Sequence, residues 1–417
     1  MLSDNELLNY KINDAYRQLR HELFCEETGL IYDSICGGNH DLRFEHLPYV
    51  EEIQANVPNP HGYATGMEDS MLNAGFAIEM CICRTEAEPE MKEECKDFAR
   101  RLFLGMVRCA TVHGHHGYVV RSVSPRDGHS CYMESSRDQF TLFVYGMWRY
   151  YHSDFSTLEE KSIVRSILAD IADYAESKMN DSASYNLGRL DGFPGVHLQM
   201  LNTQSHEAMR LPMFFAAAYD VTSELRFLDL YQKYYPRAMI ESERMRERTR
   251  PWWHIELSQM QFSLALCRNV DPDNKHMEHF DSLMTHIAEL AETQTSEYHF
   301  PCMNDYHAPW NPPVHAWRNS RHFTVQLFED GKVAMRGGKV YLKGEESPEF
   351  KVAFDRIRAL GNMITAMLLA SNYQPNRKFW EDFNNSVSVP EYKGHPSGGL
   401  VNILCAYFMA RMRKLLA

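Results

Sequence analysis

Residues 134–140, ESSRDQF, bring together side chains that could perform acid–base chemistry. They include two carboxylates, two hydroxyls and a guanidinium, directly before the apolar run FTLFVYGMWRYY. A second segment of this kind, TGMEDS at 65–70, also precedes an apolar helix pattern. Two carboxyl groups with different pKa values can cleave a glycosidic bond, one as the acid and the other as base or nucleophile. The candidate catalytic residues are Asp69 and Asp138, with Glu68 and Glu134 as substitutes.

The same residues also fit a local structural role. Thr65 with Glu68, and Ser135 with Asp138, match the capping box, in which a hydroxyl and a later carboxylate bond each other's backbone. Carboxylates in a first helical turn also complement the helix dipole. Because a cap does not require Arg137 beside Asp138, we expect the segment to be both a helix start and part of a site.

Hydrophobic periodicity predicts a chain built almost entirely of helices. Helices are expected at 4–24, 67–83, 89–112, 137–152, 157–179, 204–221, 223–246, 253–268, 272–294, 318–328, 348–371 and 397–415. The range 325–343 differs, since it alternates and carries Asp-Gly and Gly-Gly turn signals that indicate a small β-hairpin insertion.

The predicted helices are of two kinds that alternate along the chain. Charged amphipathic helices such as 157–179 suit an outer ring, and nearly apolar helices such as 137–152 suit an inner ring packed on both sides. Joints from outer to inner helices are long, whereas several in the other direction are short. Six pairs would close into an all-α (α/α)6 toroid, a single domain over 1–417. All long joints would then meet at the mouth of the inner ring, where ligands bind.

The long joints combine aromatic rings with hydrogen-bonding side chains, which is the mixture that sugars need. The candidates for substrate binding are Arg137, Gln139, His115, His116, Tyr118, Arg121, Asp191, His206, Trp252, Trp253, His254, Tyr306, His307 and Trp317. An arginine among them could hold a substrate carboxylate through a two-pronged contact. The histidines at 113, 115 and 116 have no carboxylate at ligand spacing, so we predict no metal site. No cofactor is predicted.

Two of these segments resemble unsaturated glucuronyl hydrolases of the six-hairpin (α/α)6 glycosidase superfamily. EDSMLNAG at 68–75 is similar to the family's segment of Asp, a short residue, Met, a long apolar residue and Asn. SSRDQFTLFVYG at 135–146 is similar to its Ser-Arg-Gly-Gln segment. The resemblance implies the toroid, Asp69 as general acid/base, and Arg137 and Gln139 as ligand contacts. The chain departs from the family at Asp138, where the family has Gly, and the family's second Asp has only an approximate counterpart in NHDLRF at 39–44.

We therefore predict a glycoside hydrolase for oligosaccharides that contain uronic acid. Either Asp69 promotes hydration of an unsaturated uronyl end, or a carboxylate pair hydrolyses an ordinary uronoside. A polysaccharide lyase on the same toroid would use a neutral His or Tyr as base. A sugar epimerase would use two opposed histidines, for which His254 and His395 are candidates. A non-catalytic carbohydrate-binding protein would need the aromatic residues but not the pairing of Asp with Arg.

The composition argues against other classes of protein. The formal net charge of −13 disfavours a nucleic-acid surface or an anionic membrane. The longest apolar runs are too short to span a bilayer, and the N-terminus has no apolar signal-peptide core. The ten scattered cysteines are typical of free thiols in a reducing compartment. We expect a cytoplasmic protein, with removal of a secretion signal as the alternative. The sequence does not indicate its oligomeric state.

Overall fold

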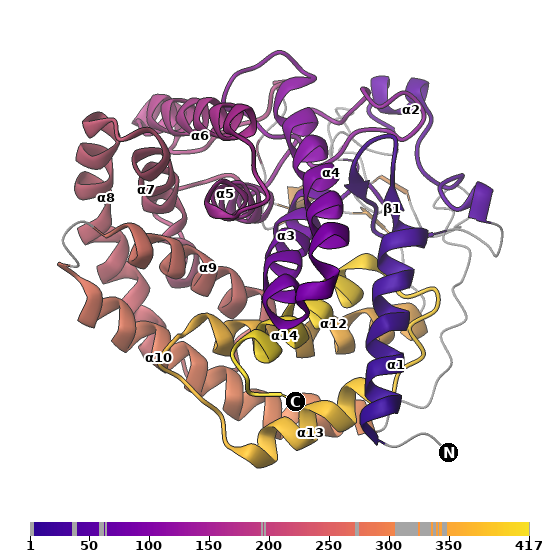
Figure 1. The fold of residues 1–417 in the computed structure, drawn as a ribbon. Coiled ribbons are helices and arrows are strands. Elements are labelled where there is room, and N and C mark those ends of the chain that lie inside the picture. The colour runs from indigo at the N-terminus through magenta and orange to yellow at the C-terminus, as the bar shows by residue number, and fades with distance from the viewer. Residues whose placement is uncertain are drawn as a thin grey trace.

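The structure is a computed structural model of the 417-residue chain. It describes residues 4–35, 40–57, 62, 65–192, 195, 197–271, 275–304, 324–325, 335–336, 339–340, 342–343 and 348–416. Helices dominate these ranges (Figure 1), which confirms the expected all-α class. No helix in them combines the length and the apolar character needed to cross a lipid bilayer.

Within the described ranges, six helices form the inner ring. They are α3 (Ser70–Ala87), α5 (Arg137–His152), α7 (Arg210–Thr222), α9 (His254–Val270), α12 (Pro348–Leu369) and α14 (Ser397–Met412). Each packs against the next, and α14 returns to pack against α3, so the ring is closed. Side-chain contacts join the starts of α3, α5, α7 and α14 at one end of the ring. We call this end the mouth.

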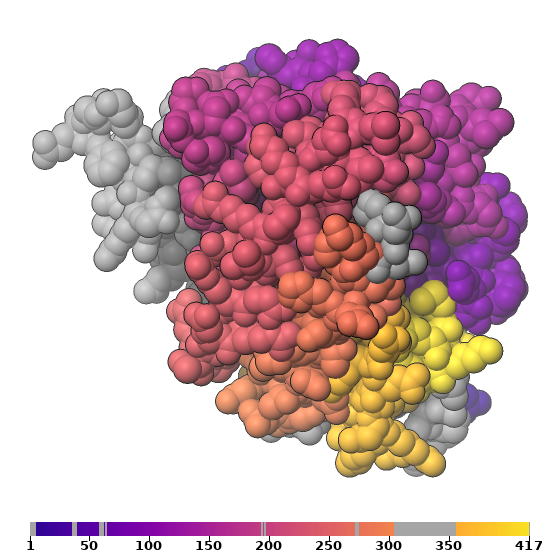
Figure 2. All heavy atoms as spheres, turned by 90° about the vertical axis from the view of Figure 1, so that its left-hand side faces the viewer, coloured from indigo at the N-terminus to yellow at the C-terminus, as the bar shows by residue number. Residues whose placement is uncertain are grey.

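Six further helices of the described chain surround this ring. They are α1 (Asp4–Arg17), α4 (Lys92–Thr111), α6 (Leu158–Lys178), α8 (Leu225–Glu243), α10 (Met277–Gln294) and α13 (Arg377–Ser388). Figure 2 shows part of this outer wall, where α6, α8, α10 and α13 succeed one another from magenta at the top to yellow at the bottom. The chain thus alternates between outer and inner helices, and the predicted (α/α)6 toroid is confirmed.

Short elements lie in the joints between these helices. The helical ones are η1 (Gln18–Leu23), η2 (His40–Leu42), α2 (Val50–Gln54), η3 (Pro89–Met91), η4 (Asp181–Ala183), η5 (Ser205–Glu207), η6 (Arg244–Glu247), η8 (Thr295–His299) and α11 (Phe300–Asn304). Strand β1 (Phe24–Cys25) pairs antiparallel with β2 (Leu30–Ile31). Strand β3 (Thr324–Val325) pairs antiparallel with β6 (Leu342–Lys343). Between them in the sequence, β4 (Met335–Arg336) pairs antiparallel with β5 (Lys339–Val340). The predicted β insertion near 325–343 is therefore confirmed.

One helix prediction was wrong and one outer helix was missed. The helix expected at 318–328 is replaced at 324–325 by β3, because the alternating pattern of 325–343 outweighs the helical period there. The outer helix α13 was missed. Its apolar stripe, with Phe379, Trp380 and Phe383 buried, lies in a segment of only 12 residues that also holds Asn and Ser, which favour turns.

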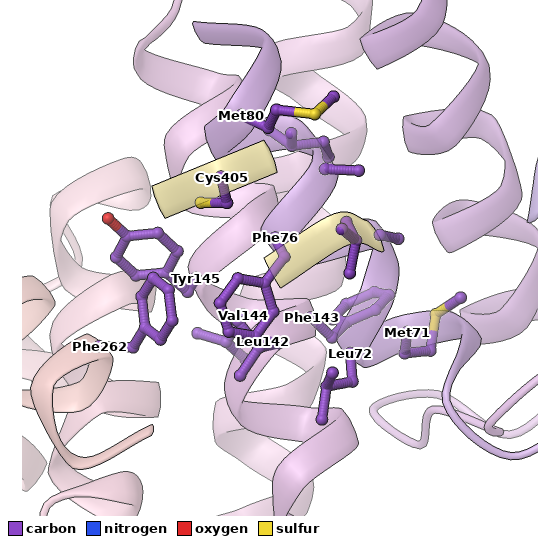
Figure 3. Close-up of a cluster of buried hydrophobic side chains, with 14 of the residues drawn as sticks. Met71, Leu72, Phe76, Met80, Leu142, Phe143, Val144, Tyr145, Phe262 and Cys405 are labelled. Atoms are coloured by element: carbon purple, nitrogen blue, oxygen red, sulfur yellow. The ribbon is translucent and has the colours of Figure 1, made fainter. Parts of the chain in front are cut away.

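The lumen of the ring is filled with side chains below the mouth. Phe262 of α9 packs edge-on against Phe76 of α3 and Tyr145 of α5, with ring centroids 5.0 and 4.6 Å apart (Figure 3). Helices α3 and α5 approach so closely that a Cβ added to Gly75 would lie 2.2 Å from the carbonyl oxygen of Leu142. Because the lumen is packed, a ligand of the ring must bind at its mouth.

The close approach of α3 and α5 can be tested with Gly75→Ala. The added methyl group cannot fit without moving one helix, so the free energy of unfolding should fall by about 1–3 kcal/mol. Gly399→Ala is the matched control, because a Cβ there meets its nearest atoms at an ordinary 3.6 Å. Urea unfolding followed by circular dichroism measures both. Equal stability of the two variants would show that the helices are not in backbone contact.

Candidate active site

Three carboxyl side chains gather at the mouth around the start of α3. Asp33, which follows β2, accepts hydrogen bonds from the backbone N–H groups of Glu68 (2.8 Å) and Asp69 (3.1 Å). Its own carbonyl oxygen accepts the N–H of Ser397, the first residue of α14. All three carboxyl side chains remain partly exposed. A segment distant in sequence therefore anchors two inner helices and adds a third acid to Glu68 and Asp69.

The surroundings of these acids are strongly unfavourable to additional negative charge. Burial, together with the charge of Asp69, raises the pKa of Asp33 to about 7. Burial and the charges of Asp33 and Asp69 raise the pKa of Glu68 well above its usual value, against a smaller opposing effect of Arg121. At least one of these carboxyl groups therefore carries a proton near neutral pH, as a general acid must.

Asp69 is held in place by side chains of two other inner helices, α5 and α12. Its Oδ1 accepts a hydrogen bond from Nε2 of Gln139 at 3.0 Å, and its Oδ2 pairs with the guanidinium of Arg358 at 3.1 Å. Gln139 is fully buried and accepts the backbone N–H of Leu72 through its other amide atom. Gln139, expected to contact the substrate, therefore contacts Asp69 and fixes its position.

The second predicted acid is also charge-paired. Asp138 accepts a hydrogen bond from Arg210, the first residue of α7, at 2.5 Å. Burial acts to raise the pKa of Asp138, but the charge and hydrogen bond of Arg210 outweigh it, so the pKa lies below its usual value. Asp138 is thus ionised at neutral pH. It remains about 38% exposed and can still reach a ligand.

Arg137 does not lie free at the mouth. Its guanidinium pairs with the carboxylate of Glu207 and donates to the carbonyl oxygen of Gln199 at 2.8 Å. Asp69 and Arg137 begin neighbouring inner helices, as predicted, but each has a different partner. Both side chains lie at the mouth, and Gln139 in the first turn of α5 links that helix to Asp69.

Four other predicted residues lie away from solvent or away from the acids. Glu134 is fully buried and paired with Arg121, whose guanidinium also donates to the carbonyl oxygen of Glu68 at 3.2 Å, so this ion pair supports the segment before α3. Tyr118 is also fully buried, and its hydroxyl donates to the carbonyl oxygen of Gly188 at 3.2 Å. His116, with its side chain 87% exposed, contacts Asp170 of the outer helix α6.

His115 is exposed beside His116. Asp191, in the joint between α6 and α7, pairs with the buried guanidinium of Arg189. Neither residue contacts the acids at the start of α3 through any of the described interactions.

The predicted residues before α9 do form a cluster. His206 packs edge-on against Trp252, with ring centroids 5.9 Å apart, and the guanidinium of Arg248 lies 3.8 Å above the Trp252 ring. Burial lowers the pKa of His206 to about 4. Trp253 is 56% exposed, and His254 is buried. The predictions Tyr306, His307 and Trp317 lie outside the described residues.

The capping interpretation was wrong at both helix starts. The N-cap residues are Asp69 for α3 and Ser136 for α5, and neither makes a side-chain capping hydrogen bond. Thr65 donates its hydroxyl to the carbonyl oxygen of Gly62. The acids at these helix starts are therefore held by contacts between distant segments.

Sequence reasoning missed Asp33, Arg210 and Arg358, which hold or surround the predicted acids. For Asp33 a signal was present, since an Asp directly follows the apolar run GLIY. The approximate counterpart of the family's second Asp, Asp41, is instead exposed on η2. The partners on α7 and α12 gave no signal, because ring closure brings them from far along the chain.

A cavity of about 380 Å³ lies at the opposite end of the ring, where α3 and α5 end. Its lining includes Lys92, Arg149 and His152, and it is separate from the acids at the mouth. Within the described chain, no group of three or more His, Cys, Asp or Glu side chains is arranged to hold a metal ion.

Comparison with known proteins gives a likeness only at the level of structure. No family model and no curated protein matches the sequence. A glycoside hydrolase family 76 mannosidase of Bacteroides thetaiotaomicron is 12% identical, with 98% of this chain and 99% of that chain covered and a TM-score of 0.48.

Two epimerases are similar to a comparable degree. A sugar epimerase from a ruminal bacterium is 9% identical, with 97% and 100% of the chains covered and a TM-score of 0.46. A cellobiose 2-epimerase of Spirochaeta thermophila is 11% identical, with 98% of each chain covered and a TM-score of 0.45.

The structural role of the Arg121–Glu134 pair is testable with Glu134→Gln. Removing one partner leaves a buried guanidinium without its counter-charge, so the free energy of unfolding should fall by about 3–5 kcal/mol. The control is Glu45→Gln at the exposed Arg126–Glu45 pair, which should cost less than about 1 kcal/mol. Chemical denaturation measures both values. A stable Glu134→Gln variant that has lost activity would instead place Glu134 in the chemistry.

Proposed function

We propose that this protein is a carbohydrate-active enzyme, a glycoside hydrolase whose catalytic carboxyl groups lie at the mouth of the toroid. The observation that carries the proposal is the contrast between two adjacent acids. Glu68 has a strongly raised pKa, whereas Asp69 is paired with Arg358 and held by Gln139. Neighbouring carboxyl groups in opposite electrostatic environments are the arrangement that glycoside hydrolysis requires.

In the proposed reaction Glu68 donates its proton to the glycosidic oxygen as the bond from that oxygen to the anomeric carbon breaks. Water adds to the anomeric carbon, and Asp69 takes the proton that the water releases. One water is consumed and two sugars leave. In the alternative scheme implied by the resemblance, Asp69 promotes the hydration of an unsaturated uronyl end. Asp69 is required in both schemes.

The class of sugar is a separate question. The resemblance implies a uronide, and a uronide needs a guanidinium for its carboxylate. The residue to which the resemblance points is Arg137, and Glu207 and the carbonyl oxygen of Gln199 already accept its hydrogen bonds. The Nε of Arg137 is buried without a partner within the described residues, so a uronide could bind through this one donor, whereas a two-pronged contact to the two Nη groups would require an exchange of partners.

A sugar epimerase is the second candidate, and one observation favours it. His254 is buried at the start of α9, and neither of its ring nitrogens has a hydrogen-bond partner within the described chain. Burial and the charge of Arg358 lower the pKa of His254 well below its usual value, so the neutral ring could accept a proton from a sugar carbon. Solvent deuterium would then enter a carbon-bound position, which ¹H NMR detects and simple hydrolysis does not produce.

We expect Asp69→Asn and Glu68→Gln each to lower kcat by about 10²–10⁴-fold, the usual contribution of acid–base catalysis. Both changes preserve side-chain size, so sugar binding measured by calorimetry should persist. Asp41→Asn, at an exposed acid of η2, should leave kcat unchanged. Full activity of both variants on an oligosaccharide that the wild type cleaves would contradict the assignment. If the wild type binds oligosaccharides but does not cleave them, the protein is a binding protein.

The proton on Glu68 should set the alkaline side of the pH profile. kcat/KM should fall as pH rises and this proton is lost. Because the negative charge of Asp33 raises the pKa of Glu68, Asp33→Asn should lower that pKa and move the alkaline limb to lower pH by about one pH unit. Asp41→Asn should not move it. A limb that stays in place or moves to higher pH in Asp33→Asn would show that Glu68 is not the acid.

A further inference from the structure

Arg358 reaches Asp69 from an inner helix that does not adjoin α3. The guanidinium Nη2 of Arg358 on α12 lies 3.1 Å from Oδ2 of Asp69, where α3 begins. In the ring, α14 stands between α12 and α3 and packs against both (Figure 1). The arginine side chain must therefore cross the start of α14 to make this ion pair.

Two glycines permit this crossing. A Cβ added to Gly361 of α12 would lie 2.5 Å from the carbonyl carbon of Asn402, so α12 and α14 are in backbone contact there. Three residues earlier on the same face of α12, the arm of Arg358 lies against Gly398 of α14. A Cβ at Gly398 would meet Cδ and Nε of the arginine at 3.4 Å. Because the helices are this close, the arginine fits only while position 398 carries no large side chain. We call this space beside Gly398 the passage.

The start of α14 is tied to α3 and to the segment before it. Ser397, directly before Gly398, donates its backbone N–H to the carbonyl oxygen of Asp33 at 2.9 Å. Its Oγ accepts a hydrogen bond from Nδ2 of Asn73 on α3 at 2.8 Å. Because these bonds hold the first turn of α14, a longer side chain at position 398 would displace the arginine rather than the helix.

Helix α12 is fixed on its other side by α9. Asn362, one turn after Arg358, donates its Nδ2 to the carbonyl oxygen of Arg358 at 2.9 Å. Its Oδ1 accepts the hydroxyl of Ser258 on α9 at 2.5 Å. Asn362 and Ser258 are both buried. The side chain that crosses α14 therefore starts from a helix whose position is set by a buried contact.

The two oxygens of the Asp69 carboxylate are held from different sides. Gln139 donates to Oδ1 and Arg358 donates to Oδ2, so the carboxylate cannot turn without breaking one contact. Burial, and then the charges of neighbouring acids, raise the pKa values of Asp33 and Glu68, so Asp69 lies among groups that repel it. The side chain of Arg358 is only 8% exposed, so it acts on Asp69 rather than on a substrate.

We propose that Arg358 is a positioning residue for the catalytic carboxylate of Asp69 and that Gly398 provides the passage it needs. This role rests on the proposed function, which it deepens by naming the group that orients Asp69. A carboxylate displaced by about 1 Å loses about 10²-fold in rate. Because Arg358 does not touch the substrate, its loss should lower kcat and leave KM nearly unchanged.

The kinetic test compares Arg358→Met with Arg358→Lys on an oligosaccharide that the wild type cleaves. Arg358→Met keeps the bulk without the charge and should lower kcat by about 10²-fold, with KM unchanged. Arg358→Lys carries the charge across the same passage and should recover about tenfold of this loss. Arg356→Met, at an arginine that donates to the carbonyl oxygen of Cys302, is the matched control and should leave kcat unchanged. Full activity of Arg358→Met, or a lysine variant no more active than the methionine variant, overturns the proposal.

The passage is tested with Gly398→Val. The branched side chain occupies the space of the arginine arm, so kcat should fall as in Arg358→Met, by about 10²-fold. Gly399→Val is the control for size, because a Cβ there meets Ile357 at 3.6 Å instead, and it should retain most of the activity. Circular dichroism confirms that each variant is folded. Equal losses in the two valine variants would show that no passage at position 398 is needed.

A double-mutant cycle separates this role from the proposed function, because urea unfolding needs no substrate. Asp69→Asn and Arg358→Met remove the same contact, so the unfolding constant of the double variant should differ by at least about fivefold from the product of the single effects. In the Gly398→Val background this coupling should vanish. If the coupling is present but the wild type cleaves no oligosaccharide, the hydrolase proposal fails and the contact through the passage stands. Additive effects in the wild-type background overturn the inference even for an active hydrolase.

Discussion

The hydrogen bonds of Asp33 hold the mouth of this protein together. Its carboxylate accepts the N–H groups of Glu68 and Asp69 where α3 begins, and its carbonyl oxygen accepts the N–H of Ser397 where α14 begins. A helix start leaves N–H groups unpaired and carries a partial positive charge. An acid from the β1–β2 segment satisfies part of this demand. The interaction therefore joins the first and last inner helices and brings the acidic side chains of the site close together.

The internal charge pairs of the mouth connect inner helices to one another. Asp69 of the α3 start pairs with Arg358 of α12, and Asp138 of α5 pairs with Arg210 of α7. Buried ion pairs contribute little net stability but are costly to break. Such pairs fix the relative positions of the inner helices.

Hydrolase and epimerase chemistry make different demands on this arrangement. A hydrolase needs a proton-donating carboxyl group, and the raised pKa of Glu68 suits that role, while Asp69 beside it is paired with Arg358. An epimerase needs a neutral base near a sugar carbon, and His254 beside Arg358 has the required charge state. Both groups lie at one end of one ring. The orientation of the bound sugar therefore decides the reaction. Hydrolysis requires the carboxyl groups to lie beside the anomeric carbon, and epimerisation requires His254 to lie beside the carbon that loses its proton.

The sequence by itself determined the all-α class, the alternation of outer and inner helices and the placement of Asp69, Asp138 and Arg137 at inner-helix starts. These features follow from local periodicity and from apolar runs such as FTLFVYGMW, and they do not depend on distant partners. Local pattern also misled, since Thr65 and Ser135 matched a capping box that the structure does not form. Only the tertiary structure decided which charges meet. Asp33, Arg210 and Arg358 reach the acids because the ring closes, and the pKa values of those acids depend on burial and on neighbours that no local pattern specifies.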